Sequence, residues 1–191
     1  TFDANNNLTG SPDGSRWIYG EGNRLLESPV KLLAYDPDGR VVRSDAPDGT
    51  AHYFYDAEGL LNRVEKSDHS VITFTYDAFQ RRVSKDVDGT KLGFLWDIAV
   101  PVVEQNCQQT SYNLFFPERF SPIARREIAN DLPSDDKCYY FHTDQIGAVQ
   151  RVTAEDGGDV WTATYTPLGE ALVNPASLMD HPFRTAGEYW D

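Results

Sequence analysis

An aromatic residue followed by aspartate recurs along the first half of this 191-residue chain. The aspartates of the regular copies stand at positions 36, 56, 77 and 97, at intervals of 20, 21 and 20 residues. The pairs are Tyr35-Asp36, Tyr55-Asp56, Tyr76-Asp77 and Trp96-Asp97, and a less regular copy, Phe2-Asp3, precedes them. A fixed period of this length predicts structural repeats, each of which packs against its neighbours.

Two turn signals fall within each repeat. Gly39 and Gly59 follow the aromatic-Asp pairs and supply the positive φ that few other residues tolerate. About half a repeat later a second signal appears, as in Asp48-Gly49. Two turns in roughly 20 residues leave two segments of ordinary strand length, so each repeat is predicted to be one β-hairpin.

The segments that lead into the aromatic residue alternate as strands do. Ile72, Phe74 and Tyr76 fall on one face, whereas the threonines between them fall on the other. A single hairpin cannot bury such a face, so the sequence predicts an all-β fold of stacked hairpins, part of a large wrapped sheet or hollow cocoon. We expect Tyr55, Tyr76 and Trp96 to be mostly buried and each aspartate to bind backbone N–H groups in its own turn.

Residues 101–137 interrupt the repeat, and four prolines punctuate them. We expect this insert to cover a sheet edge or plug an opening. Within it, Phe120 to Asp131 could form a short helix or a loop. The chain is thereby predicted to divide into repeat hairpins over 1–100, the insert over 101–137 and a third segment over 138–191.

Charge and cysteine content exclude several classes of protein. A formal net charge of −13 argues against nucleic acid or an anionic membrane as the partner. Cys107 and Cys138 lack the spacing of a metal site, and no apolar run approaches the roughly 20 residues of a membrane span. We expect neither a metal nor a cofactor.

His142 and Asp144 are the residues that most invite a catalytic or metal-binding interpretation. Side chains two residues apart on a strand point to the same side, and imidazole with carboxylate is a common acid-base pair. A metal would need a third ligand, which the neighbouring sequence lacks. We favour a structural role here, and also for tryptophans such as Trp161 that could otherwise stack on sugars.

Several of these motifs resemble those of a known family. YDPDGR at 35–40, YDAEGL at 55–60 and YDAFQRR at 76–82 resemble the YD repeats of the Rhs proteins, although Gln80 replaces the usual glycine. Residues 138–170 are similar to the Rhs-associated core segment, although Thr166 stands where an aspartate is usual. The run from Pro182 to Asp191 is similar to the stretch that follows this core segment in the family. The core-segment motif is carried by His142, Asp144, Gly147, Tyr165, Pro167 and Gly169.

The resemblance implies a shell rather than an enzyme. In this family the repeats wind into a hollow β cocoon around a C-terminal polypeptide, commonly a toxin, as in type VI secretion effectors and the BC component of insecticidal toxin complexes. It implies as partners the remainder of the same shell and its toxin cargo, with secretion-apparatus or chaperone proteins as further candidates.

The resemblance also implies a route and a larger protein. A shell of this kind would be made in the bacterial cytoplasm and then secreted or delivered to a target cell. The aspartates that cleave such shells are expected beyond Asp191, which predicts that the chain is a fragment of a longer protein without self-cleavage activity of its own. The alternative function is a carbohydrate- or protein-binding β module.

Overall fold

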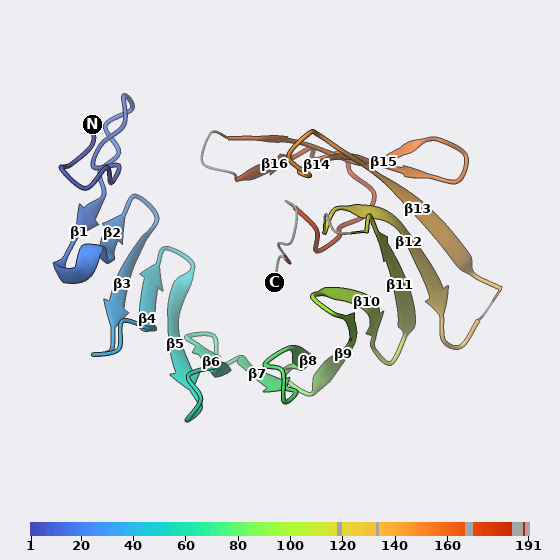
Figure 1. Ribbon diagram of the computed structural model, residues 1–191, viewed down its shortest axis with the longest axis horizontal. Helices are drawn as coiled ribbons and strands as arrows, with labels where there is room; N and C mark the ends of the chain where they lie inside the picture. Colours follow the sequence, from blue (N-terminus) through green and yellow to red (C-terminus); the bar gives the residue numbers. More distant parts are fainter. Residues whose placement is uncertain (118–119, 133, 167–169, 185–188, 190–191) are drawn as a thin grey trace. The chain divides into compact units, whose positions relative to one another are not determined.

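The computed structural model describes residues 1–117, 120–132, 134–166, 170–184 and 189, and its fold is all-β (Figure 1). The described residues form sixteen strands that follow one another in the sheet in chain order, with antiparallel neighbours, and one short 3-10 helix. The prediction of an all-β fold built from successive hairpins is therefore confirmed.

The first half of the chain contains eight strands and the helix η1. Their bounds are β1 Ile18–Tyr19, η1 Glu21–Asn23, β2 Leu25–Ser28, β3 Lys31–Tyr35, β4 Val41–Ala46, β5 Gly49–Tyr55, β6 Leu61–Lys66, β7 Val71–Tyr76 and β8 Arg82–Val87. The remaining strands are β9 Thr90–Asp97, β10 Val100–Gln105, β11 Gln109–Phe115, β12 Pro122–Ala129, β13 Asp136–Thr143, β14 Val149–Ala154, β15 Asp159–Tyr165 and β16 Ala171–Val173.

These elements form two compact units, which are described separately. The first unit comprises residues 1–76 and 85–90, and the second comprises residues 77–84 and 91–191.

In the first unit, each 20-residue repeat supplies two strands. The register shifts between Ala34 and Tyr35 and again between Phe54 and Tyr55, where the partner strands β4 and β6 each carry one extra residue. Strands β4 and β6 show little apolar alternation, yet each is paired on both sides. Pairing to two neighbours thus decides their conformation where the local pattern is weak.

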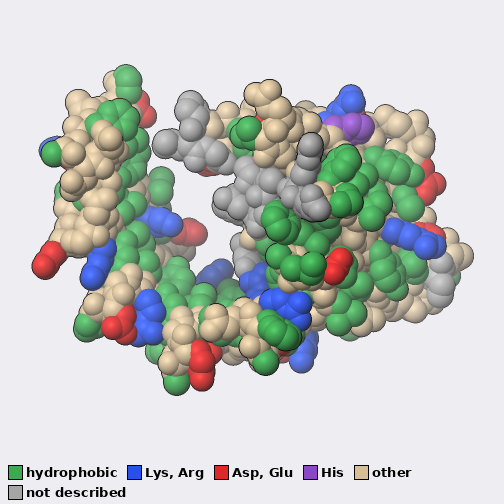
Figure 2. All heavy atoms as spheres, viewed as in Figure 1, with side chains coloured by type: hydrophobic (Ala, Val, Ile, Leu, Met, Phe, Trp, Pro, Cys, Tyr) green, Lys and Arg blue, Asp and Glu red, His purple; other side chains and the backbone are tan. Residues whose placement is uncertain are grey.

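The second unit contains the main hydrophobic core of the described residues. Its buried members come from β13, β14 and β15 and from the C-terminal segment, which folds back against the sheet (Figure 1). They are Phe141, Val149, Val152, Trp161, Ala163 and Phe183. On the opposite face of the sheet, Tyr112 and Leu114 of β11 are exposed, and hydrophobic side chains are visible on the surface of this unit in Figure 2.

Residues 120–131 form neither the helix nor the loop that the sequence suggested. Pro122–Ala129 is strand β12, which pairs with β11 on one side and β13 on the other. A proline is tolerated at the first residue of a strand, where no ladder donor is needed, so Pro122 starts this one without cost. The run from Ile123 to Ile128, which contains three charged residues, is therefore ordered as a strand by pairing with its two neighbours.

The segment 101–137 as a whole was expected to cover or plug the sheet, and this expectation was wrong. Strands β11 and β12 lie within the segment, β10 begins one residue before it, and all three continue the sheet in chain order. The division of the chain into three domains stays a prediction.

Candidate functional site

The aspartate of the repeat closes a five-residue turn. Asp36 accepts a 2.9 Å hydrogen bond at Oδ1 from the N–H of Arg40, and its own N–H donates to the Arg40 carbonyl at 2.9 Å. Asp56 and Leu60 form the same pair of bonds, at 2.8 and 2.9 Å. The N–H of Arg40 also holds the pKa of Asp36 below its ordinary value, because it stabilises the ionised carboxylate. Each carboxylate is thereby committed to its own turn.

The same turn recurs where the residue before the aspartate is not tyrosine, as in Thr143-Asp144 and Phe2-Asp3. Asp144 accepts 3.0 Å bonds from the N–H groups of Ile146 and Ala148, and Gly147 in this turn has a φ of 85°. Asp3 accepts 2.9 Å bonds in the same way from Asn5 and Asn7. The HTDQIG motif of the core segment is thus a variant of the YD turn.

Trp96-Asp97 keeps the repeat spacing but uses another turn. Asp97 pairs directly with Val100, so the loop contains only Ile98 and Ala99. Asp97 is exposed, unlike Asp36 and Asp56. Spacing alone did not reveal this change in turn type.

The fourth position after the aromatic requires a left-handed backbone. Gly39 and Gly59 adopt φ values of 86° and 82° there, whereas Gln80 adopts 63°. Because a side chain costs roughly 1–2 kcal/mol in this region, Gln80→Gly is expected to raise the free energy of unfolding by about 1 kcal/mol after the flexibility of glycine is deducted. Chemical denaturation of the variant measures this gain. The reverse change, Gly59→Gln, should lower stability by a similar amount, and a gain from both changes would contradict the explanation.

The Tyr hydroxyl or Trp Nε1 of each repeat donates a hydrogen bond to the preceding strand. In every case the acceptor is a backbone carbonyl, and the ring is partly buried. The bonds are Tyr35 to Leu25 at 2.7 Å, Tyr55 to Val41 at 2.8 Å, Tyr76 to Leu61 at 2.7 Å, Trp96 Nε1 to Arg82 at 2.7 Å and Tyr165 to Val149 at 2.8 Å. The repeat residues therefore stitch successive strands together.

We call the five bonds from the repeat aromatics to backbone carbonyls the aromatic ladder. An arginine stacks on one of the rings of this ladder. The guanidinium of Arg40 lies 2.7 Å from Asp36 Oδ2 and 5.1 Å from the centre of the Tyr55 ring in the next repeat. A guanidinium can satisfy both partners, since its edge donates hydrogen bonds while its plane packs on an aromatic face. The contact explains why a basic residue follows the glycine in YDPDGR.

His142 and Asp144 are not brought together as an acid-base pair. His142 is exposed, and its Nε2 lies 3.0 Å from Thr153 Oγ1. Strand β13 ends at Thr143, and Asp144 Oδ2 accepts instead from Gln150 at 3.2 Å. Of the other core-segment residues, Pro167 and Gly169 lie outside the described residues. The two side chains thus have separate structural contacts.

A buried ionic cluster in the second unit was missed by sequence reasoning. Arg125 lies 2.9 Å from Glu104 Oε1 and also donates to Asn113 at 3.0 Å and Ser111 at 3.0 Å. The side chains of Arg125 and Glu104 are only 8% and 4% exposed. Burial alone would lower the pKa of Arg125, but the charge and hydrogen bond of Glu104 raise it above its ordinary value. We call these four residues the Arg125 cluster.

Tyr189 joins the C-terminal segment to this cluster. Its hydroxyl donates to Glu104 Oε2 at 3.2 Å, although the two residues are 85 positions apart. Burial and the neighbouring Glu104 carboxylate both raise the pKa of Tyr189 above its ordinary value. The phenol therefore stays protonated and acts as a donor to the carboxylate.

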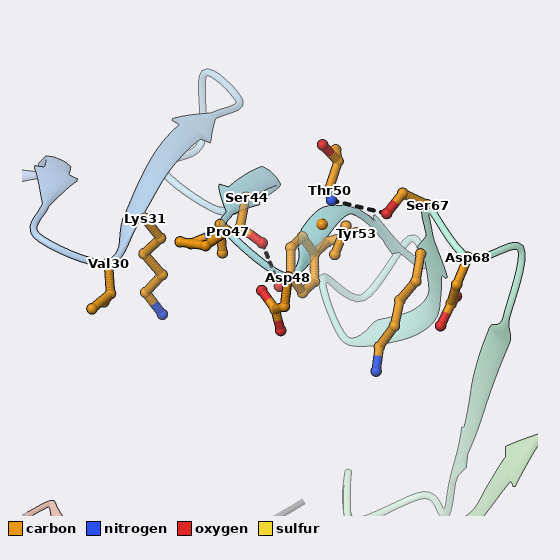
Figure 3. Close-up of a pocket in the computed structure, with 13 residues that line it drawn as sticks. Val30, Lys31, Ser44, Pro47, Asp48, Thr50, Tyr53, Ser67 and Asp68 are labelled. Atoms are coloured by element: carbon orange, nitrogen blue, oxygen red, sulfur yellow. Dashed lines mark hydrogen bonds between the residues drawn. The ribbon is translucent and has the colours of Figure 1, made fainter.

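A surface cavity of about 590 Å³ lies in the first unit, beside the turns that join β4 to β5 and β6 to β7 (Figure 3). The hydroxyls of Ser44 and Tyr53 bond to each other across it at 3.0 Å. The N–H of Thr50 donates to Ser67 Oγ at 3.1 Å, which links adjacent hairpins. The polar groups drawn together here are bound to one another as part of the fold.

The described residues form neither a metal-binding cluster nor a membrane-spanning helix. Within that part of the chain, no three His, Cys, Asp or Glu side chains gather as a metal site would require. No helix among the same residues is long and apolar enough to cross a membrane.

Comparisons with known proteins agree with the repeat geometry. The family model described as Teneurin YD-shell matches residues 1–189. Double-stranded DNA deaminase toxin A of Burkholderia cenocepacia (strain H111) is 29% identical over 219 residues, an alignment that covers 100% of this chain. The chain spans only 15% of the length of that relative.

Solved structures show the same fold. The crystal structure of TcdB2-TccC3 matches with a TM-score of 0.53 and 15% identity, over 100% of this chain and 11% of that one. The Photorhabdus luminescens Tc holotoxin pore matches with a TM-score of 0.50 and 13% identity, over 90% of this chain and 13% of that one. At these identities the similarity concerns the fold alone.

Proposed function

Because this chain belongs to the teneurin YD-shell family, we propose that it is a wall segment of a toxin shell that encloses a polypeptide cargo. The observation that carries the proposal is the family match over residues 1–189. The ladder supports it, since each repeat aromatic bonds to an earlier strand and so adds one hairpin to a continuous wall. The partners would be the remaining shell and its cargo.

The segment would act by containment rather than by catalysis. The acidic side chains of the repeat turns are occupied by backbone N–H groups, as Asp36, Asp56 and Asp144 illustrate. The deaminase in the name of the Burkholderia relative belongs to a protein of which this chain covers 15%. Any such activity would therefore lie in another part of a larger protein.

Delivery follows from the same proposal. A toxin shell of this kind would be made in the bacterial cytoplasm and then secreted or delivered, by type VI secretion or a related route, with secretion-apparatus or chaperone proteins as transient partners. The family resemblance supports this route.

Enclosure predicts protection from proteases. In the full-length protein, the enclosed polypeptide should be cleaved by a nonspecific protease at least about tenfold more slowly than the same polypeptide expressed alone, because cleavage requires an opened state. Mass spectrometry of timed digests measures both rates. Equal rates would reject the shell, and a glycan array probed with the intact protein would then test the alternative function of a carbohydrate-binding module.

A further inference from the structure

His181 occupies an unusual position for a histidine. It lies in the segment from Asp180 to Arg184, which reaches into the core of the second unit, and it is 4% exposed. Its ring centre is 4.4 Å from that of Trp161 in β15 and 5.1 Å from that of Phe141 in β13. The imidazole is therefore enclosed by aromatic rings.

The hydrogen bonds of His181 fix its protonation state. The N–H of Phe183 donates to Nδ1 at 3.2 Å, so Nδ1 is unprotonated and the ring proton is on Nε2. Nε2 is buried and has no hydrogen-bond partner among the residues that the structure describes. Burial lowers the pKa of His181 to about 3, since a charged imidazolium would lose its hydration in this core.

The charged groups that face His181 do not favour a second proton. Arg184, on the same segment, repels a positive charge, as does Arg125 on β12. Asp180 attracts a positive charge, but it is already paired with Arg184 at 2.9 Å and its side chain is 78% exposed. The residues packed on the ring from β13 and β15, Phe141 and Trp161, are uncharged.

Protonation would therefore break the local structure. A proton on Nδ1 would set two donors against each other, because the Phe183 N–H already points at that atom. The neighbouring Phe183 is 3% exposed and contacts Phe115 and Phe141, with ring centres 5.3 and 5.7 Å away. Displacement of His181 would thus move Phe183 away from its contacts in the core.

We propose that the segment Asp180–Arg184 is an acid-sensitive latch, in which proton uptake by His181 releases Phe183 from the core of the second unit. The inference goes beyond cargo enclosure, since it concerns when this part of the wall loosens. It depends on the packing of the second unit and not on what the shell contains.

The direction of the pH effect follows from linkage. The pKa of His181 is about 3 in the folded state, and it returns to the ordinary value of 6.5 when the segment is released. Between these two pH values the released segment therefore binds more protons than the folded one. The latch is fully stable above about pH 6.5 and weakens as the pH falls toward 3. The opening equilibrium should rise about 20-fold between pH 7 and pH 5.

Hydrogen exchange at the amides of His181, Phe183 and Arg184 in the full-length protein, corrected for intrinsic exchange at each pH, tests the latch. The wild type should show the 20-fold rise, and His181→Asn should remove most of it, because the amide oxygen can accept from Phe183 N–H without titrating. His142→Asn, which changes an exposed histidine, should keep the wild-type response.

Two results would overturn the latch. One is an equal pH response in the wild type and in His181→Asn. If that variant does not fold, an NMR titration of the His181 ring in the wild-type protein decides instead. A ring that takes up its proton near pH 6.5 while the amides of His181, Phe183 and Arg184 stay protected is incompatible with the proposal.

Discussion

Replacing Arg125 by alanine is expected to lower the free energy of unfolding of the second unit by about 3–5 kcal/mol. The loss arises because Glu104, 4% exposed, would keep a buried negative charge without its partner. The hydrogen bonds from Arg125 to Asn113 and Ser111 would be lost at the same time. Denaturant unfolding of the full-length protein measures the effect, with hydrogen exchange in β10 to β12 as the readout of the second unit.

The adjacent residue on the same strand provides a matched control. Arg126 pairs with Asp136, but its side chain is 55% exposed, so Arg126→Ala should cost less than about 1 kcal/mol. Replacing the buried pair together, as Glu104→Leu with Arg125→Met, should recover much of the loss, because the buried Glu104 charge is removed with its partner. Glu127, which lies 2.7 Å from Arg125 Nε, also loses its partner, but its side chain is 18% exposed and so reaches water. Equal losses from Arg125→Ala and Arg126→Ala would show that burial of the pair is unimportant.

The local sequence was sufficient to predict the repeat turns, because their hydrogen bonds join residues that are close in sequence. The bonds of Asp36 and Asp56 fall within five residues, and Gly39 and Gly59 carry the positive φ that their turn requires. Such features are written in consecutive residues, so a repeated pattern predicts them well. The aromatic positions were likewise predictable, although their hydroxyl bonds to an earlier strand were not.

The missed features depend on residues that are distant in sequence. Strand β12 has a charged residue, Arg125, at a buried position, so its pattern does not resemble a half-buried strand. Arg125 is buried only because Glu104 and Asn113 on β10 and β11 meet it there. The pairing of His142 with Asp144 failed for a related reason, since β13 ends between them and Asp144 belongs to a turn.

Replacing Phe183 by alanine is expected to destabilise the second unit by about 3–5 kcal/mol, because the surrounding rings can collapse only partly into the cavity. Phe183 is 3% exposed, and Phe115, Phe141 and Tyr189 lie 5.3, 5.7 and 6.1 Å from it between ring centres. Leu178→Ala is the control: this side chain, in the same C-terminal part of the chain, is 81% exposed and should change stability by less than about 0.5 kcal/mol.

Denaturant unfolding at pH 7.5 keeps His181 neutral and so separates this packing loss from the acid response. The variant should also lose protection in β13 to β15, where Phe141, Val152 and Trp161 share the core with Phe183. If Phe183→Ala proved as mild as Leu178→Ala, the C-terminal segment would contribute little to the core. The core of this unit would then be complete without it, and His181 could take up a proton with no consequence for the sheet.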